Sequence, residues 1–263
     1  MRRAGYLAAL ALTLSVLVLP STVMADEVAP QKAVLITGAS TGIGRNAAEH
    51  LAAAGYFVYA GARKAADLEE LNKIDNIMAV RLDVTRQDEI DAAVALIRQE
   101  GRGLWGIVNN AGVNVVAPLI EADISELEFL FNVNVYGVFR VTKAFAPLVI
   151  ESKGRIVNIS SISGFLSGGG YGMYSASKHA VEAFTDSLAR EMEELDVFVA
   201  AIEPGNFASE IGLSRGKRRL ADTDAQRLVS FVERRQRRRA RCRERGVAGV
   251  GSEGAGRGAG GAA

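Results

Sequence analysis

The sequence has a single cysteine, Cys242, so no intrachain disulfide can form. It also lacks a positive charge excess over its first 212 residues. Residues 213–263 hold 14 Lys and Arg against 5 Asp and Glu, a net +9, which leaves −8 for residues 1–212. This excludes a basic nucleic-acid surface on that part. The whole chain of 263 residues is 49% apolar and 23% charged, which is typical of one globular α/β domain.

The N-terminus has the composition of a secretory leader. Met1-Arg2-Arg3 is positive, Ala4–Pro20 is almost entirely apolar, and Val23-Met24-Ala25 offers the small residues at which signal peptidase cuts. Residues 1–25 are therefore predicted to be a signal peptide cleaved after Ala25, followed by a linker over 26–32. An uncleaved anchor is the alternative, although seventeen residues fall short of the roughly 20 that span a bilayer. Either form predicts an exported or a membrane-tethered protein.

Strand and helix patterns then alternate along the chain. Such alternation predicts an α/β fold, a doubly wound, Rossmann-like parallel sheet with helices on both faces. The expected strands are Ala33–Thr37, Tyr56–Ala60, Ile77–Leu82, Leu104–Asn109, Arg155–Ser160 and Val197–Ile202. The expected helices are Gly42–Ala54, Asp88–Gln99, Ser125–Glu151 and one that bears Tyr174 and ends near Leu195.

A glycine-rich turn, TGASTGIG at 37–44, lies between the first strand and its helix. Glycines there allow positive φ and close backbone approach, and the helix N-terminus offers unpaired N–H groups to a pyrophosphate. The strand–turn–helix context favours a dinucleotide site over a merely structural turn. The predicted cofactor contacts in this turn are Gly38, Ser40, Thr41, Gly42, Ile43 and Gly44.

The second strand ends without the acidic residue that an NAD site places on the adenosine ribose. Gly61-Ala62-Arg63-Lys64 stands there, and no acid appears before Asp67. A carboxylate would repel a 2′-phosphate, whereas a guanidinium can bind it through two hydrogen bonds. The sequence therefore favours NADP(H) over NAD(H), with Arg63 as the residue that binds the 2′-phosphate. The alternative is that Arg63 and Lys64 belong to a solvated basic turn with no role in cofactor choice.

Tyr174 and Lys178 lie four residues apart and share a helix face, and Ser161 follows the fifth strand at the sheet edge where such folds bind ligands. A free tyrosine, with a pKa near ~10, exchanges protons poorly at neutrality, and a nearby ammonium favours its phenolate. Tyr174 is thus predicted to be the general acid for carbonyl reduction, or the base for alcohol oxidation. Ser161 would hydrogen-bond the substrate oxygen, and Lys178 would also hold the nicotinamide ribose.

These motifs, in this order, resemble the short-chain dehydrogenase/reductase family over residues 33–212. The resemblance implies further contacts. Asp83 and Val84 would meet the adenine, Asn109 with Ala111 and Gly112 would line the cofactor and brace the sheet, and Asn134 would hold a proton-relay water. Pro204, Gly205 and Ser209 would lie beside the nicotinamide. The segments 58–64 and 203–207 resemble the retinol and hydroxysteroid dehydrogenase branches, which implies a lipophilic alcohol or ketone. No metal site is expected, and the resemblance implies a homo-oligomer for an intact family member.

After residue 212 the family pattern stops. A seventh strand and the helix before it are expected there, but residues 213–263 are rich in Arg, Gly and Ala. Three explanations fit: a disordered extension, an arginine-rich nucleic-acid-binding arm, or a reading-frame change near 226–245. We favour the third, because GC-rich DNA read out of frame yields these residues.

Three classes of function follow from the sequence. They are an NADP(H)-dependent reductase, a nucleotide-binding protein that lacks its substrate lobe and does not turn over, and a basic interaction protein that acts through its tail. The complete catalytic set favours the first.

Overall fold

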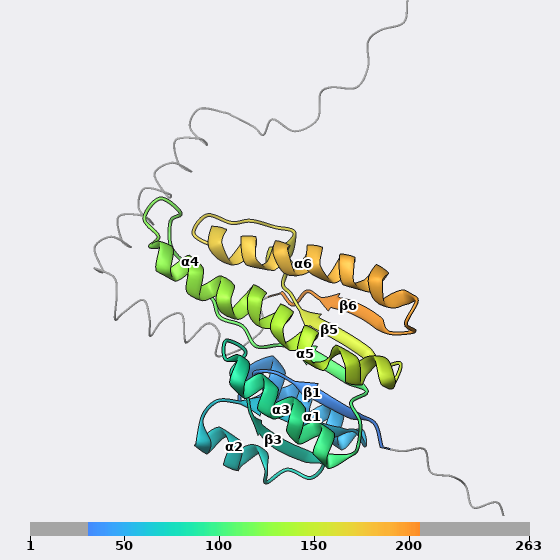
Figure 1. Ribbon diagram of the computed structural model, residues 1–263. Coiled ribbons are helices and arrows are strands. Elements are labelled where there is room, and N and C mark those ends of the chain that lie inside the picture. Colours follow the sequence, from blue (N-terminus) through green and yellow to red (C-terminus); the bar gives the residue numbers. More distant parts are fainter. Residues whose placement is uncertain (1–30, 206–263) are drawn as a thin grey trace, which may run out of the picture. The chain divides into compact units, whose positions relative to one another are not determined.

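The computed structural model describes residues 31–205, and six parallel strands form one sheet in this part of the chain (Figure 1). Their order is β3-β2-β1-β4-β5-β6, so the direction of winding reverses between β1 and β4. Ligands in such sheets bind beyond the carboxyl ends of the strands at this reversal. The doubly wound parallel sheet expected from the sequence is confirmed. The strands are β1 (Ala33–Ile36), β2 (Phe57–Ala62), β3 (Ile77–Arg81), β4 (Gly106–Asn109), β5 (Arg155–Ile159) and β6 (Phe198–Ile202).

Helices cover both faces of the sheet because successive strand residues point to opposite sides. Leu35 and Tyr59 belong to the apolar cluster that packs against α3 (Gln87–Glu100), α5 (Gly137–Glu151) and α6 (Gly172–Glu193). Val34 and Val58, their strand neighbours, belong to the cluster that packs against α1 (Gly42–Ala53) and α2 (Ala65–Leu71). The strands are therefore buried on both faces of the sheet, as in other all-parallel sheets.

The predicted helix over Ser125–Glu151 is continuous but contains a π-helical turn. It consists of α4 (Ile124–Phe131), the π-helical segment η1 (Asn132–Tyr136) and α5. By length and apolarity the run could span a membrane, yet half of its most apolar window is buried inside the fold. Packing against the sheet accounts for its composition. Its π turn is a feature often found at functional sites.

Two local expectations were wrong. Strand β2 runs to Ala62 rather than ending at Ala60, and α2 follows it without having been predicted. Gly61 lies inside the strand, where a Cβ would come within 3.1 Å of the Ile36 carbonyl oxygen. The predicted leader at 1–25, most of the linker, Ser209 and the tail at 213–263 lie outside the described residues.

Candidate active site at the carboxyl edge of the sheet

The glycine turn joins β1 to α1 through left-handed backbone that glycine adopts readily. Gly38 and Gly42 have φ values of 65° and 59°. The turn also packs tightly on the segment after β4, since a Cβ at Gly38 would lie 2.9 Å from the Ala111 Cα. A Cβ at Gly44 would lie 2.5 Å from the Gly38 carbonyl oxygen. These positions therefore have no room for a side chain.

Two residues outside the predicted set hold the turn in place. The Thr37 hydroxyl accepts hydrogen bonds from the backbone N–H groups of Asn110 and Ala111, both at 3.0 Å. The Asn110 side chain in turn donates to the carbonyl oxygens of Thr37 (2.9 Å) and Gly38 (3.0 Å). Sequence reasoning missed this role, although Thr37 begins the quoted glycine-rich turn and Asn110 lies between the predicted Asn109 and Ala111. Their bonds tie together the ends of β1 and β4.

The N-terminus of α1 has the character of an anion-binding site. Thr41 is its exposed N-cap residue, but no side-chain hydrogen bond caps the helix, and its first turn has no acidic residue. Ser40 and Ile43 are half-buried beside it. Backbone N–H groups and the helix dipole therefore remain available to a phosphate. The residues present fit the pyrophosphate of a dinucleotide.

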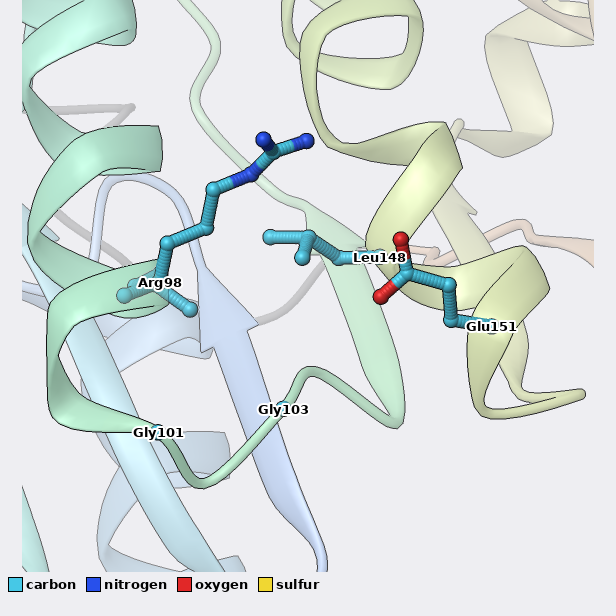
Figure 2. A pocket seen from close by; sticks show the side chains of 6 residues that line it. Arg98, Gly101, Gly103, Leu148 and Glu151 are labelled. Atoms are coloured by element: carbon cyan, nitrogen blue, oxygen red, sulfur yellow. The ribbon is translucent and has the colours of Figure 1, made fainter.

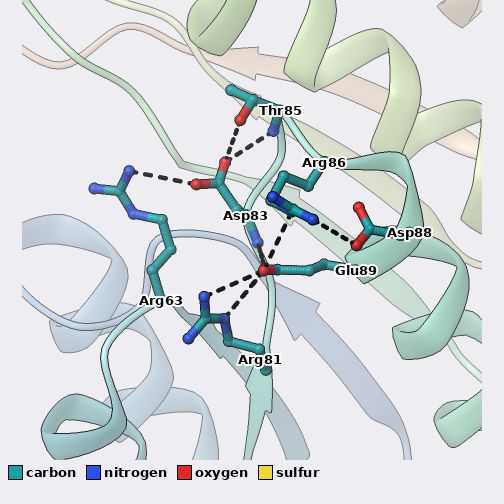
Figure 3. A network of polar contacts seen from close by, with 7 residues as sticks. All are labelled: Arg63, Arg81, Asp83, Thr85, Arg86, Asp88 and Glu89. Atoms are coloured by element: carbon teal, nitrogen blue, oxygen red, sulfur yellow. Dashed lines mark hydrogen bonds and ion pairs between the residues drawn. The ribbon is translucent and has the colours of Figure 1, made fainter.

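Arg63 follows β2 directly and meets Asp83, which follows β3 (Figure 3). One guanidinium nitrogen lies 3.6 Å from an Asp83 carboxylate oxygen. Burial raises the pKa of Asp83, but hydrogen bonds from Thr85 and the charge of Arg63 outweigh it and leave the pKa below its ordinary value. The Arg63 side chain is 62% exposed, so this ion pair contributes little and can rearrange at small cost.

The other arginines of this network are already engaged by acids. Arg81 and Arg86 both bind Glu89, and Arg86 also binds Asp88 at 2.8 Å (Figure 3). Glu89 further accepts the backbone N–H of Asp83 at 2.8 Å. Arg63 has only its 3.6 Å contact, whereas Arg81 and Arg86 each have a shorter one, so Arg63 is the most readily released of the three.

The predicted catalytic residues meet near the start of α6 and the end of β5. Lys178 is 5% exposed and its Nζ donates a 2.7 Å hydrogen bond to the Ile159 carbonyl oxygen. The same Nζ lies 5.8 Å from the centre of the Tyr174 ring. Burial lowers the pKa of Lys178 to about 8, and the charge of Glu182, one helical turn further on, works against that decrease. The ammonium is thus held beside the phenol in a poorly hydrated place.

Ser161 stands two residues beyond β5 and is 8% exposed. Its Oγ accepts the backbone N–H of Ser163 at 3.1 Å, which leaves its own hydroxyl hydrogen for another acceptor. The next residue, Ile162, donates its backbone N–H to the Pro204 carbonyl oxygen at 3.2 Å. The structure therefore brings Pro204, and Gly205 after it, next to the Ser161 turn.

Asn134 lies in η1 and acts as a clamp. Its Oδ1 accepts the Val113 N–H at 2.8 Å, and its Nδ2 donates to the Val113 carbonyl oxygen (2.9 Å) and to the Ser177 hydroxyl (3.1 Å). A Cβ at Gly112 would lie 3.5 Å from the Asn134 Oδ1 and 4.0 Å from the Lys178 Nζ. The segment after β4, the π turn and α6 therefore converge at Lys178. The role of Asn134 in holding a water stays a prediction.

Two predicted cofactor residues direct their side chains into the core. The Asn109 amide donates to the Thr142 hydroxyl (3.0 Å) and to the Asn158 Oδ1 (2.8 Å), and so braces β4 against β5 and α5. Val84 is 6% exposed and packs so tightly on α5 that a Cβ at Gly137 would lie 2.6 Å from its methyl group. The bracing predicted for Asn109 is thus present, and cofactor contact by either residue stays a prediction.

A hollow of about 360 Å³ lies at the opposite edge of the sheet (Figure 2). Arg98 and Gly101 line it from the end of α3, and Leu148 and Glu151 line it from the end of α5. It holds none of the predicted residues. The predicted site residues lie instead at the carboxyl edge, among the side chains described above.

A glycine turn on a helix N-terminus, with Ser161, Tyr174 and Lys178 beyond the neighbouring strand ends, defines a doubly wound dinucleotide-binding domain. The family model described as short chain dehydrogenase matches residues 32–219, and the chain belongs to this family. Members of this family are NAD(P)-dependent oxidoreductases.

Three known proteins illustrate the similarity. The chain is 40% identical over 199 residues to D-beta-hydroxybutyrate dehydrogenase, mitochondrial, of Bos taurus (72% of this chain, 58% of the relative). It is 42% identical over 188 residues to retinol dehydrogenase 7 of Mus musculus (68% and 58%). It matches the closed form of serine dehydrogenase complexed with NADP⁺ with a TM-score of 0.68 and 30% identity (70% and 77%). The chain thus spans a little over half the length of these curated relatives.

Proposed function

We propose that the chain is an NADP(H)-dependent oxidoreductase that interconverts a carbonyl and an alcohol. One observation carries this proposal. Lys178 is buried, bound to the end of β5 at 2.7 Å, and held 5.8 Å from the Tyr174 ring. A buried ammonium without a salt bridge is costly, and such groups gather at functional sites. Its charge stabilises a phenolate at Tyr174, which a proton-exchanging tyrosine needs.

The residues divide the chemistry as follows. A bound nicotinamide supplies a hydride to the carbonyl carbon in reduction and accepts it in oxidation. Tyr174 donates its hydroxyl proton to the carbonyl oxygen in reduction and takes that proton back in oxidation. Ser161 donates a hydrogen bond to the same oxygen, since its Oγ already accepts from Ser163. Lys178 stabilises the phenolate and holds the ribose, and Asn134 holds the relay water beside it.

The cofactor preference rests on Arg63. Its guanidinium is 62% exposed at the carboxyl edge and bound only by a 3.6 Å contact to Asp83. It can therefore turn to a 2′-phosphate, and no acid at the end of β2 opposes that charge. A solved structure similar to this chain holds NADP⁺, which supports the same choice. The glycine turn would hold the pyrophosphate, and Pro204 with Gly205 would line the nicotinamide.

The substrate is a small alcohol or ketone, as the names of the relatives suggest, and they include both a hydroxy acid and a retinol dehydrogenase. The protein is proposed to be exported, or tethered to a membrane by its N-terminal segment. This proposal rests on the composition of residues 1–25 alone. A homo-oligomer is proposed by analogy with the family.

A second candidate function is nucleotide binding without turnover. It is favoured by the arginine-rich sequence that follows the family match, which ends at residue 219. The substrate lobe of an intact family member would begin near that point. An unmutated protein that binds NADPH but reduces no carbonyl compound would favour this second function.

Replacement of Tyr174 by Phe tests the proposal, because the change removes the proton and keeps the ring. We expect carbonyl reduction to decrease by about 10²–10⁴-fold, the usual contribution of a general acid. NADPH binding, followed by fluorescence titration, should persist. Tyr56→Phe is the matched control, since Tyr56 precedes β2 at the far edge of the sheet and packs against Trp105. Activity within a few-fold of the unmutated protein would show that the phenol is not the acid.

A further inference from the structure

Large apolar side chains are exposed on two loops beside the catalytic tyrosine. Six of the exposed large hydrophobic residues in the described chain lie there, and we call them the apolar rim. Their exposed fractions lie between 43% and 95%, and large apolar side chains exposed close together are typical of ligand-binding or interaction sites. The apolar rim consists of Leu119, Ile120, Ile124, Ile162, Phe165 and Leu166.

The first loop of the apolar rim, residues 113–123 followed by Ile124 at the start of α4, is fastened to the start of α6. The Ala117 N–H donates to the Gly170 carbonyl oxygen at 3.0 Å. The Leu119 side chain lies over Gly172, where a Cβ would come within 2.7 Å of its methyl group. Below it, Val115 packs in one cluster with Tyr174. Leu119 is therefore held close to the residue proposed to donate the proton.

The second loop begins at Ser161 itself. The Leu166 N–H donates to the Ile162 carbonyl oxygen at 2.9 Å, which closes a turn of chain directly after the serine. The Leu166 carbonyl oxygen accepts the Ser175 hydroxyl at 3.4 Å, so this loop also reaches α6 beside Tyr174. The two loops thus flank both residues that would meet the substrate oxygen, and each presents apolar side chains.

The same loops contain no cation. Residues 110–126 and 160–173 lack Lys, Arg and His, and they include the acids Glu121, Asp123 and Glu126. The nearest catalytic cation, Lys178, is buried and bound to Ile159. A substrate carboxylate would therefore lose its hydration without gaining a partner from these loops, and nearby acids would repel it.

We propose that this site selects an uncharged substrate with an extended apolar body, and disfavours hydroxy and keto acids. The carbonyl would lie at Ser161 and Tyr174, with the apolar body covering Leu119 on one loop and Phe165 on the other. This inference rests on the proposed function, and it adds the class of substrate.

A series of methyl ketones tests the apolar part. Burial of one methylene is worth about 0.8 kcal/mol, or about fourfold in affinity. With the full chain and NADPH, kcat/KM should increase about two- to fourfold for each carbon added from 2-butanone to 2-octanone. Phe165→Ser and Leu119→Ser should flatten that increase. Leu195→Ser is the matched control, because Leu195 is 44% exposed just beyond the other end of α6 and should leave the increase unchanged.

A matched pair of substrates tests the charge. Methyl 3-oxodecanoate and free 3-oxodecanoate differ only in the carboxylate, and the ester should be preferred by about tenfold or more in kcat/KM. Equal use of the two, or a preference for the acid, would overturn the proposal. The proposal would also be overturned if kcat/KM increased with ketone chain length and Phe165→Ser and Leu119→Ser both left that increase intact.

A binding measurement separates this inference from the proposed function. If no carbonyl is reduced, calorimetric titration of the NADPH-loaded chain with the ester and with the acid still tests which class of substrate the site binds. Binding of the ester alone, weakened by Leu119→Ser, would support the substrate class while the proposed reaction fails. The apolar rim would instead meet a lipid surface if Phe165→Ser and Leu119→Ser both lost binding to phosphatidylcholine vesicles and left kcat/KM for the ketones unchanged.

Discussion

Lys178 donates a 2.7 Å hydrogen bond to the carbonyl oxygen of Ile159, the last residue of β5. The bond holds an ammonium at the carboxyl edge of the sheet, two residues before Ser161 in the strand direction and within 5.8 Å of the Tyr174 ring centre. A contact between a helix and a strand thus fixes Lys178 relative to Ser161 and Tyr174, the other two residues proposed for catalysis. Because this ammonium is buried, its pKa connects activity and stability to pH.

Activity should decrease as the pH rises through about 8, since Lys178 then loses the proton that stabilises the phenolate. Glu182 is the charged group that raises this pKa, and its Oε1 is buried with no hydrogen-bond partner among residues 31–205. Glu182→Gln should therefore move the alkaline limb of the kcat profile to lower pH, while Glu191→Gln, on the exposed side of α6, should not. An unchanged profile in Glu182→Gln would show that this carboxylate does not act on Lys178.

Lys178→Met should increase the stability of the domain while abolishing turnover. The folded pKa of Lys178, about 8, is below the ordinary 10.5, so the unfolded state binds more protons between these values. The free energy of unfolding should hence rise from pH 8 to pH 10.5 by about 3 kcal/mol through this group. Below pH 8 the full free-energy cost of burying the charged ammonium is present, and Lys178→Met should remove this cost. Urea unfolding at pH 7 and pH 10 would measure both; a destabilised variant at pH 7 contradicts the argument.

Arg63→Ala should reduce the preference for NADPH over NADH. A charge-assisted contact to the 2′-phosphate is worth about 1.5–3 kcal/mol, or one to two decades in affinity. Affinity for NADH should change little, because the variant removes only the phosphate contact. Arg81→Ala serves as control, since Arg81 also carries positive charge nearby but is bound by Glu89. Fluorescence titrations in which the unmutated protein binds NADH as tightly as NADPH would refute the assignment.

Phe198→Glu should reduce self-association. Within the described residues β6 pairs only with β5, and no other described strand pairs with the backbone groups of its outer edge. Phe198 is 55% exposed on the face opposite buried Val199, and the Arg155 guanidinium lies 5.2 Å from its ring. A glutamate there would place a charge at the edge and could pair with Arg155. Sedimentation velocity should show fewer large species than for Leu195→Glu, the control outside the strand; equal distributions would rule out this edge as the cause.

The sequence predicted the sheet because parallel strands buried on two sides are short apolar runs, and amphipathic helices separate them. It failed at the end of β2, which was expected at Ala60 and lies at Ala62. A Cβ at Gly61 would make a tight 3.1 Å contact with the Ile36 carbonyl oxygen, and that close approach depends on a strand distant in sequence. Periodicity equally could not reveal η1, since a π turn differs from an α-helix only in its hydrogen bonding.

The sequence by itself determined the residue types that the chemistry needs: a glycine turn before a helix, a Tyr and Lys one turn apart, and an arginine where an acid would select NAD. Only the tertiary structure decided how they are used. It directed Asn109 into the core rather than toward the edge, engaged Arg63 with Asp83, and fastened two apolar loops on either side of Tyr174. The physical reason is that spacing records neighbours along one element, whereas burial, charge pairing and close approach arise between elements brought together by folding.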